Sequence, residues 1–392
     1  MRTAVIFGAG NVGRGFLGQL FSESGYHVTF VDVDEPLIHA LNEHHAYSIR
    51  LVENERVDEA YIAPVDALHS RQKDEVARAL AGADLAATSV GARVLPAVAP
   101  LVAAGLRQRF QAGSPAPLNI IICENLKDAA RTFREMVAGH MLAQDAEWFD
   151  ARVGFVDTVI GRMVPPPTAE MRAEDPRLIA VEPYKELPVD RKGFVGAIPQ
   201  ISGMEVCDNF GAYTARKLYI HNCGHAVLAY LGFQRGYTFG YEALEDPRIR
   251  PWFERALAES RTGIVAEYGV EAAWLEKHTI DLVRRFANRA LGDTIFRLGR
   301  DPLRKLAASD RLVGAARLAE KAGAVPEALS LGIAAAYAFQ DPADPLALEL
   351  QQRIAARGLG AAMLEVSGIQ PDEPLGMRVA DAYARLGRGE WA

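Results

Sequence analysis

The sequence is poor in the features that mark secreted, membrane-spanning and nucleic-acid-coating proteins. Its 392 residues include only three cysteines, Cys123, Cys207 and Cys223, which are too few and too scattered for a disulfide framework or a zinc ribbon. No window approaches the roughly 18 uninterrupted apolar residues of a membrane span, and residues 1–8 lack a basic-then-apolar leader. The net charge of −7 argues against a protein that coats a duplex. We therefore expect reduced thiols and a soluble, cytoplasmic protein, with no nucleic-acid or membrane partner.

The first half of the chain alternates short β-rich runs with helical patterns. The expected buried strands are 3–7, 28–33, 85–89 and 118–123, and the expected helical segments lie near 11–24, 35–44, 71–81 and 92–112. Strands that alternate with helices indicate βαβ units and a parallel sheet covered on both faces. This part is therefore predicted to be an α/β domain with a doubly wound parallel sheet.

The second half has a different pattern. A less regular region from 152 to 199 is followed by Ala/Leu/Arg-rich periodic runs such as 310–323, 326–339 and 345–358, with proline at starts and glycine at ends. A chain of 392 residues is also long for one core. We predict two domains: the doubly wound domain over 1–195 and a mainly α-helical domain over 196–392.

A glycine-rich motif follows the first expected strand and opens a helix. It comprises Gly8, Gly10, Asn11, Val12 and Gly13. In this context the first glycine permits a tight turn, the second lets the backbone approach a pyrophosphate, and the third allows close packing of helix on strand. The helix N-terminus adds amide donors and a favourable dipole. The motif predicts a dinucleotide site; the alternative is a glycine-rich turn without a ligand.

Acidic residues at the end of the second strand bear on which dinucleotide is bound. Asp32 lies 19 residues after Gly13, where a carboxylate accepts hydrogen bonds from ribose hydroxyls and repels a 2′-phosphate. NAD is therefore favoured over NADP. Asp34 and Glu35 reinforce that negative potential or act as helix N-cap residues. Arg14 contacts the pyrophosphate or is a solvated helix residue.

The segment 217–225, Lys-Leu-Tyr-Ile-His-Asn-Cys-Gly-His, combines a base, an amide and an imidazole. At about 100° per residue, Lys217, Asn222 and His225 fall within one broad helix face. Apolar neighbours indicate a partly buried helix, where desolvation would lower the pKa of a lysine toward that of a useful base. The alternative is that Lys217 extends to solvent and the other two are satisfied core polar residues.

Two further interpretations of this segment come from other functional classes. His221, Cys223 and His225 would be zinc ligands in a metal-dependent dehydrogenase, but on a helix Cys223 points away from the two histidines. A sensor or scaffold that binds NAD without chemistry would not need Lys217 with Asn222 and His225. Turnover of NADH and resistance to chelators distinguish these possibilities.

A dinucleotide domain followed by a helical domain with Lys-x4-Asn-x2-His resembles the polyol-specific long-chain dehydrogenase/reductase family over nearly the whole chain. The resemblance is to the short form of the family that acts on a phosphorylated polyol. The shared motifs are Phe-Gly-Ala-Gly-Asn-Val-Gly-Arg-Gly-Phe at 7–16, Pro-Leu-Asn-Ile-Ile-Ile-Cys-Glu-Asn at 117–125, Gly-Phe-Val-Asp at 154–157, Pro-Leu-Arg-Lys-Leu at 302–306 and Asp-Arg-Leu at 310–312.

The resemblance implies hydride transfer between mannitol 1-phosphate and NAD, giving fructose 6-phosphate, with no metal. Lys217 would be the general acid and base. Asn222, with Asn125 by family analogy, would donate hydrogen bonds to the developing alkoxide or carbonyl oxygen. His225 would position the substrate oxygen.

The resemblance also implies substrate contacts from later in the chain. We map these to Arg297 and Lys305, with Arg300 and Arg304 as phosphate-binding residues; the alternative is a solvated basic helix face. The expected partner is a small sugar or polyol phosphate, and the chain is expected to be a monomer or weak dimer.

One position departs from the family pattern. Relatives commonly carry Asp before the arginine of an Arg-Ile-Val-Pro-like segment, whereas here Gly161 precedes Arg162. A substrate hydroxyl contact would then be missing. This departure bears on polyol specificity. The alternative activity is that of a related polyol or hexuronate dehydrogenase, like the mannitol 2-dehydrogenases, acting on a non-phosphorylated substrate.

Overall fold

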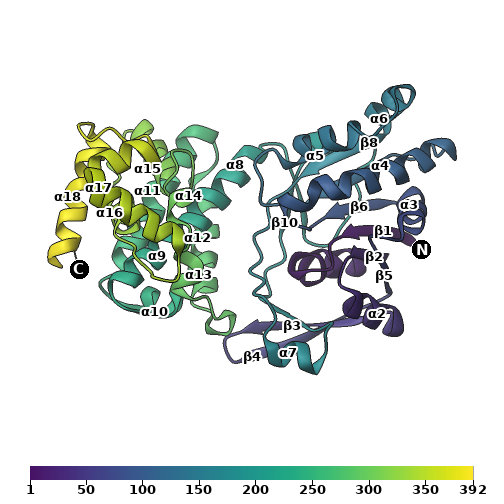
Figure 1. The fold of residues 1–392 in the computed structure, drawn as a ribbon, viewed down its shortest axis with the longest axis horizontal. Coiled ribbons are helices and arrows are strands. Elements are labelled where there is room, and N and C mark those ends of the chain that lie inside the picture. The colour runs from purple at the N-terminus through teal and green to yellow at the C-terminus, as the bar shows by residue number, and fades with distance from the viewer. Residues whose placement is uncertain (392) are drawn as a thin grey trace. The chain divides into compact units, whose positions relative to one another are not determined.

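The chain divides into two compact units, Met1–Phe210 and Gly211–Ala392. The structure is a computed structural model that describes residues 1–391, and its elements are labelled in Figure 1. Among the described residues, every strand lies in unit 1, and unit 2 is built from helices. The predicted fold class is confirmed: a parallel Rossmann-type sheet precedes a mainly helical region.

A six-stranded parallel sheet forms the centre of unit 1, in the order β5-β2-β1-β6-β7-β8. Its strands are β1 (Arg2–Phe7), β2 (Tyr26–Asp32), β5 (Val65–His69), β6 (Leu85–Thr88), β7 (Leu118–Ile122) and β8 (Val153–Asp157). The four strands expected from the apolar runs are all present. From β1 the chain adds β2 and β5 on one side of the sheet, and then β6, β7 and β8 on the other side. The parallel strands β1 and β6 therefore lie at the switch point of the sheet, and ligands of doubly wound sheets bind in the crevice at the carboxyl ends of these strands.

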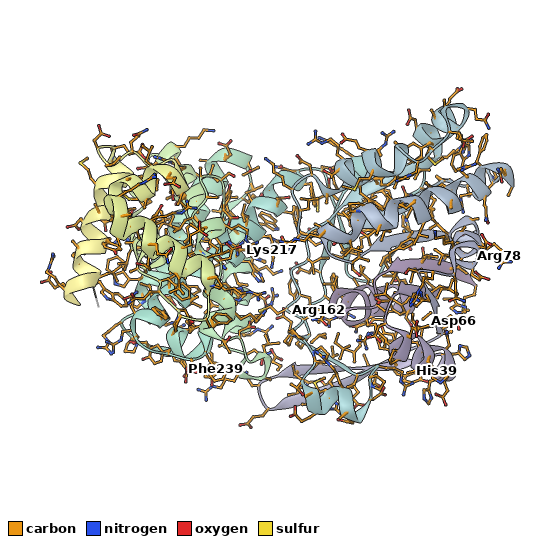
Figure 2. The ribbon with its side chains drawn as sticks, viewed as in Figure 1. His39, Asp66, Arg78, Arg162, Lys217 and Phe239 are labelled. Carbon is orange, nitrogen blue, oxygen red and sulfur yellow. The ribbon has the colours of Figure 1, made fainter. Side chains whose placement is uncertain are left out.

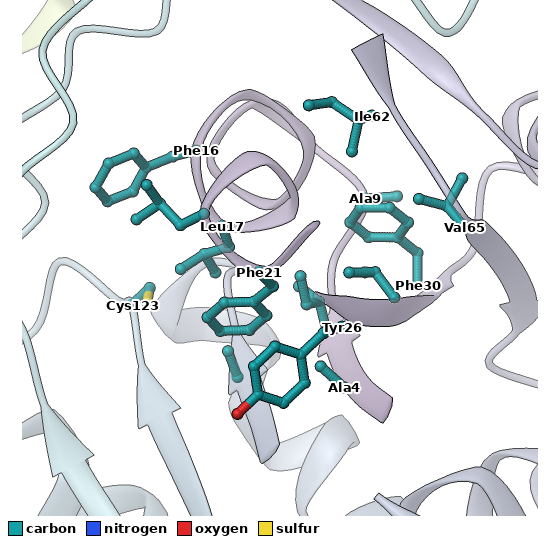
Figure 3. Packing of buried hydrophobic residues seen from close by; sticks show 14 of the residues in the cluster. Ala4, Ala9, Phe16, Leu17, Phe21, Tyr26, Phe30, Ile62, Val65 and Cys123 are labelled. Carbon is teal, nitrogen blue, oxygen red and sulfur yellow. The ribbon is translucent and has the colours of Figure 1, made fainter. Parts of the chain in front are cut away.

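Apolar cores cover both faces of this sheet, which is why central strands such as β1 and β6 are mostly hydrophobic. Within β1, Ala4 and Ile6 join a core against one face, whereas Val5 and Phe7 join the core against the other. The first core, drawn in Figure 3, takes its helical side chains from the segments after β1 and β2. The second core takes them from the helices between β5 and β8.

Helices cover the two faces as the alternating pattern predicts. The helical elements of unit 1 are the π-helix η1 (Gly13–Gly18), α1 (Gln19–Glu23), α2 (Glu35–His44), α3 (Lys73–Gly82), α4 (Leu95–Gln111), α5 (Ala129–Ala138), α6 (Ala146–Arg152) and α7 (Ala169–Glu174), with 3-10 turns at Ala92–Val94, Ala143–Asp145 and Arg191–Gly193. In Figure 1, α3, α4 and α5 lie on one side of the sheet and α2 on the other.

Unit 1 also contains two small sheets that the apolar pattern did not predict. One has the order β4-β3-β9, with β3 (Tyr47–Glu53), β4 (Arg56–Ile62) and β9 (Ile179–Val181), and the other pairs β10 (Leu187–Asp190) with β11 (Met204–Cys207). Strand β4 is mostly exposed, so it lacks the apolar run of a buried strand. The region from 152 to 199 is accordingly more regular than predicted, since β8, β9 and β10 all lie within it.

Unit 2 is a helical bundle. Its elements are α8 (Phe210–Ala215), the π-helix η5 (Arg216–Asn222), α9 (Cys223–Gln234), α10 (Gly240–Glu245), α11 (Arg250–Tyr268), α12 (Ala272–Phe286), a 3-10 turn (Arg289–Leu291), α13 (Ile295–Gly299), α14 (Pro302–Lys305), α15 (Val313–Lys321), α16 (Glu327–Tyr337), α17 (Pro345–Ser367) and α18 (Pro374–Arg388).

The three helices expected late in the chain are present as α15, α16 and α17. Helix α17 continues beyond the expected end at Gly358, where φ is 81° and the backbone is not helical. The glycine therefore marks a break within the helix instead of its end. Across the part of the chain that the structure describes, no helix is both long and apolar enough to cross a membrane.

Candidate active site

The glycine motif forms a tight turn between β1 and η1. Gly8 has a φ of 101°, which disfavours any residue with a Cβ atom. A Cβ atom on Gly13 would lie 1.9 Å from the carbonyl oxygen of Gly8, so this helix can approach the strand only with glycine there. Around Gly10, by contrast, a Cβ atom would meet nothing within 4 Å. The turn thus leaves open space beside its second glycine, which suits the close approach of a pyrophosphate.

Asn11 and Val12 complete the turn and are both partly buried. The Asn11 side-chain amide donates to the carbonyl of Val164 at 3.5 Å. Val12 packs against the first core. Both side chains therefore anchor the turn to unit 1, and their main-chain groups are the parts that remain for a ligand.

Asp32 ends β2 beside this turn. Its Oδ2 accepts from the amide of Ala9 at 2.6 Å, and its Oδ1 accepts from the amides of Val33 and Asp34 at 2.7 and 3.1 Å. These bonds fix the carboxylate at the carboxyl end of the strand, where a ribose hydroxyl would be bound. Asp34 is the N-cap of α2, since its side chain accepts from Leu37.

The alternative that Arg14 is a solvated helix residue is wrong. Its side chain is 5% exposed, and Nε donates to the carbonyl of Ala9 at 2.6 Å. Nη1 donates to the carbonyls of Pro176, at 3.3 Å, and Arg177. Burial lowers the pKa of the guanidinium. Arg14 is therefore an internal support of the turn.

The loop after β7 carries Asn125 and a residue that the sequence did not single out. The Glu124 carboxylate is 8% exposed and accepts from the amides of Val90 and Gly91 at 2.9 and 2.8 Å. It ties the loop after β7 to the loop after β6, and Asn125 next to it is exposed. The sequence did contain a signal for Glu124, because it is an acidic residue directly before Asn125 at the end of a strand. Neighbouring parallel strands end at the same edge of a sheet, so such an acid lies close to the loop after the next strand.

The segment with Lys217 and Asn222 is a π-helix instead of the predicted α-helix. η5 spans Arg216–Asn222, and the amide of Cys223 donates to the carbonyl of Leu218, five residues earlier. In an α-helix, residues five apart diverge by about 140°, whereas i to i+5 bonding brings them onto nearly the same face. The widened turn therefore brings Lys217, which is labelled in Figure 2, and Asn222 closer to one helix face than the predicted α-helix would.

His225 lies in the first turn of α9 and is held by aromatic contacts. Its ring stacks on Phe286 of α12 at 3.8 Å and 17°, and the ring of His221 is 4.9 Å away, edge to face. Its Nε2 is 4.0 Å from Oδ2 of Asp293. Burial, followed by the charges of Lys217 and Arg297, lowers the pKa of His225 well below its usual range. The imidazole is therefore neutral near pH 7.

Besides burial, the charge of Lys217 also lowers the pKa values of two further histidines, His221 and His278. Burial and then the charge of Lys217 lower the pKa of His221. Burial, Arg216, Arg285 and Lys217 lower the pKa of His278 to about 2. His221, His225 and His278, whose pKa values burial and the charge of Lys217 lower, therefore stay uncharged near pH 7.

The three residues of the zinc alternative do not converge. The Cys223 thiol is fully buried and interacts with Ser260, and burial raises its pKa to about 12. The rings of His221 and His225 instead contact Phe286. No group of three or more His, Cys, Asp or Glu side chains among residues 1–391 is arranged to hold a metal ion.

The basic residues at 297–305 do not form one solvated helix face. Arg297 lies on α13 and forms an ion pair with Asp293. Arg300 is the C-cap of α13. Arg304 lies on α14 and pairs with its N-cap Asp301 at 3.0 Å.

Lys305 differs from these arginines because it is only 3% exposed. Its Nζ donates to the carbonyl of Arg300. Burial, followed by the charges of Arg311 and Arg304, lowers the pKa of Lys305 to about 7. The cluster therefore combines two arginines in ion pairs, Arg297 and Arg304, with one buried lysine whose charge depends on pH.

Gly161 is closely packed against an aromatic ring. A Cβ atom at this position would lie 2.8 Å from Cε1 of Tyr184. The Tyr184 hydroxyl donates to the carboxylate of Glu186 at 2.8 Å. An aspartate at position 161 would require the Tyr184 ring to move. The glycine that replaces the family's aspartate therefore fits the position of this ring.

A Rossmann-type unit with a dinucleotide turn, followed by a helical unit with a lysine, an amide and a neutral imidazole, defines a two-domain dehydrogenase that uses a nicotinamide dinucleotide. The chain belongs to the mannitol dehydrogenase family. Residues 2–203 match the mannitol dehydrogenase Rossmann domain and residues 209–368 match the mannitol dehydrogenase C-terminal domain.

Curated relatives match nearly the whole chain. A mannitol-1-phosphate 5-dehydrogenase of Geobacillus thermodenitrificans is 38% identical over 98% of this chain and 98% of its own length. The mannitol-1-phosphate 5-dehydrogenase of Bacillus subtilis is 40% identical over 95% of this chain and 97% of its own.

Solved structures share the fold at lower identity. The mannitol 2-dehydrogenase of Pseudomonas fluorescens, in a ternary complex with NAD and D-mannitol, has a TM-score of 0.73 at 18% identity, covering 99% of this chain and 92% of that one. A substrate-free D-sorbitol dehydrogenase has a TM-score of 0.82 at 16% identity, covering 99% of this chain and 93% of that one.

Proposed function

We propose that the protein interconverts mannitol 1-phosphate and fructose 6-phosphate with NAD as the hydride acceptor and without a metal ion. The observation that carries this proposal is the match, at 38–40% identity over 95–98% of the chain, to relatives named mannitol-1-phosphate 5-dehydrogenase. The residues of segment 217–225 supply the groups that this chemistry needs.

Lys217 is the general base when the alcohol is oxidised and the general acid when the ketone is reduced. NAD, when bound, supplies the hydride acceptor. Lys217 lies on η5, and the pKa values of His221 and His225 are lowered, so among these groups we assign the hydroxyl proton to Lys217. The amine must be unprotonated to accept that proton.

Amide donors stabilise the charge that develops on the reacting oxygen. Asn222, brought onto the face of Lys217 by the π-turn, donates its side-chain N–H to this oxygen. We include Asn125 as a second donor, and its loop is held in place by Glu124. His225, fixed by its stack on Phe286, donates to or accepts from the same hydroxyl and sets its direction.

The basic residues bind the substrate. Arg297 and Lys305 contact the polyol, and Arg300 and Arg304 lie near the phosphate. The guanidinium groups suit bidentate phosphate recognition. The buried amine of Lys305 offers a short-range contact that strengthens when the amine is protonated.

Asp32 selects NAD over NADP. Its carboxylate is already fixed by three main-chain amides, and a 2′-phosphate beside it would meet a like charge. Asp34 adds a second negative charge at the same strand end.

The experiment that tests this proposal is a substrate and cofactor panel followed by NADH absorbance. Purified protein is given mannitol 1-phosphate, mannitol, sorbitol 6-phosphate or hexuronates, each with NAD or NADP, before and after chelation. We expect the highest kcat/KM with mannitol 1-phosphate and NAD, unchanged by EDTA. Higher activity with mannitol or a hexuronate would favour the alternative dehydrogenase, and zinc-reversible loss would contradict the role of Lys217.

A further inference from the structure

Hydrogen bonds hold the peptide unit between Ala9 and Gly10 and the two peptide units next to it. The amide of Ala9 donates to Asp32 at 2.6 Å, and the carbonyl of Ala9 accepts from Nε of Arg14 at 2.6 Å. The carbonyl of Gly10 accepts from the main-chain amide of Arg14 at 3.0 Å. One residue, Arg14, therefore binds two successive carbonyls of the turn, one through its side chain and one through its backbone.

The Arg14 side chain is itself fixed by groups far along the chain. Nη1 donates to the carbonyls of Pro176 and Arg177, which lie just before β9. The main-chain carbonyl of Arg14 accepts from the Tyr47 hydroxyl at 2.8 Å. The side chain is 5% exposed, so its donors act on protein carbonyls within the unit.

This arrangement sets the direction of the Gly10 amide. In a trans peptide the carbonyl of one residue and the N–H of the next point in opposite directions, and the bond from Ala9 to Gly10 is trans. Since Arg14 holds the Ala9 carbonyl on the buried side, the Gly10 N–H is directed away from it. Gly10 is exposed and has open space around its Cα atom.

We propose that Arg14 is a positioning residue of the dinucleotide site, which keeps the Gly10 amide directed at the pyrophosphate without touching the cofactor itself. The inference rests on the proposed use of NAD. The essential contact is the single Nε–H bond to Ala9, because that bond fixes the peptide plane; the charge of the guanidinium is secondary.

Three substitutions separate the bond from the charge. In Arg14→Gln, the amide nitrogen Nε2 follows the same number of bonds from Cα as Nε of arginine, so the donor to Ala9 is kept and the charge is lost. In Arg14→Met a methyl carbon takes that place and both are lost. In Arg14→Lys the charge is kept, but a carbon replaces the donor at that place.

The readouts are the Kd for NADH by fluorescence titration, the KM for NAD, kcat at saturating NAD, and thermal unfolding. We expect Arg14→Met to raise Kd and KM roughly 10- to 100-fold with kcat nearly unchanged. Arg14→Gln should remain within about fivefold of the parent and bind NADH more tightly than Arg14→Lys.

Arg109→Met is the matched control. Arg109 on α4 is 4% exposed and binds the carbonyls of Ala81 and Ala83 at 2.8 Å, so it is an equally buried arginine that supports other loops. We expect lower thermal stability in this variant but an unchanged Kd for NADH.

Each outcome decides the proposal. Weaker NADH binding by Arg14→Gln than by Arg14→Lys would overturn it in favour of a direct ionic contact. Equal Kd values in Arg14→Met and Arg109→Met would reduce Arg14 to a structural role and overturn it too. If Arg14→Met does not fold, the Gln and Lys variants alone decide. Absence of NADH binding by the parent protein would instead refute the proposed function.

Discussion

The two candidate sites are built from different parts of the chain. The dinucleotide turn of unit 1 presents main-chain groups, and its side chains, such as Arg14 and Val12, serve as supports. The segment 216–225 of unit 2 presents side chains, and its backbone supports them through a π-turn. Substitutions at the first site should therefore alter cofactor binding through the shape of the backbone. Substitutions at the second should alter catalysis through the chemistry of one functional group.

The sharpest way to separate the two sites is to remove the base. Lys217→Met deletes the amine and keeps much of the side-chain volume. We expect kcat to fall by roughly 10²- to 10⁴-fold, with the Kd for NADH unchanged because the dinucleotide turn lies in the other unit. NADH absorbance and fluorescence titration on one preparation measure both quantities. Parallel loss of NADH binding would show that the two sites are not independent.

The amide on the π-turn should be the next most sensitive position. Asn222→Ala removes a donor aimed at charge that develops only in the transition state, so we expect kcat to fall roughly 10²- to 10³-fold with a smaller change in KM. Steady-state kinetics with mannitol 1-phosphate provide the test. A change confined to KM would assign Asn222 to ground-state binding alone.

Cofactor choice depends on the acid at the end of β2. Asp32→Ala removes the like charge that a 2′-phosphate would meet, and we expect the ratio of kcat/KM for NAD to that for NADP to fall at least about tenfold. Asp34→Ala, which removes a nearby charge that caps α2, is the control and should change this ratio less. An unaltered preference in Asp32→Ala would refute its assigned role.

The smallest expected effect is a dependence of substrate binding on pH. The pKa of Lys305 is lowered to about 7, so its ammonium is charged below that pH and neutral above it. We therefore expect the KM for mannitol 1-phosphate to rise several-fold between about pH 6 and pH 8 as this cation is lost.

Lys305→Arg keeps its charge throughout that range and is the control for titration of the substrate phosphate itself. Its KM should change less with pH than that of the parent protein. Identical pH profiles for the two proteins would remove Lys305 from substrate binding.

Strands β1, β2, β6 and β7 of the main sheet were predictable from their apolar runs, whereas β5 and β8 were not predicted. Runs such as 118–122 are apolar except for Asn119, and they alternate with helical patterns. The sheet β4-β3-β9 was missed because β4 is an exposed edge strand with charged residues, and β9 has only three residues. Neither gives the apolar run on which strand prediction depends.

The residue types of the candidate catalytic segment were predictable, but its geometry was not. Hydrophobic periodicity does not distinguish i to i+4 from i to i+5 bonding over seven residues, so η5 was expected as an α-helix. The burial of Arg14 and Lys305 was likewise hidden, because their partners are main-chain carbonyls. Every residue has a main-chain carbonyl, so the residue types alone do not show which carbonyls accept these bonds.

Rescue of Lys217→Ala by added primary amines would test the central claim, that Lys217 is the proton acceptor, most directly. The rate of NADH formation from mannitol 1-phosphate is measured against the concentration of methylamine and amines of other pKa values, in protein that binds NADH normally. The account predicts that the rate rises with the concentration of free amine and follows amine basicity. A folded variant that binds NADH and mannitol 1-phosphate but responds to no amine would contradict it.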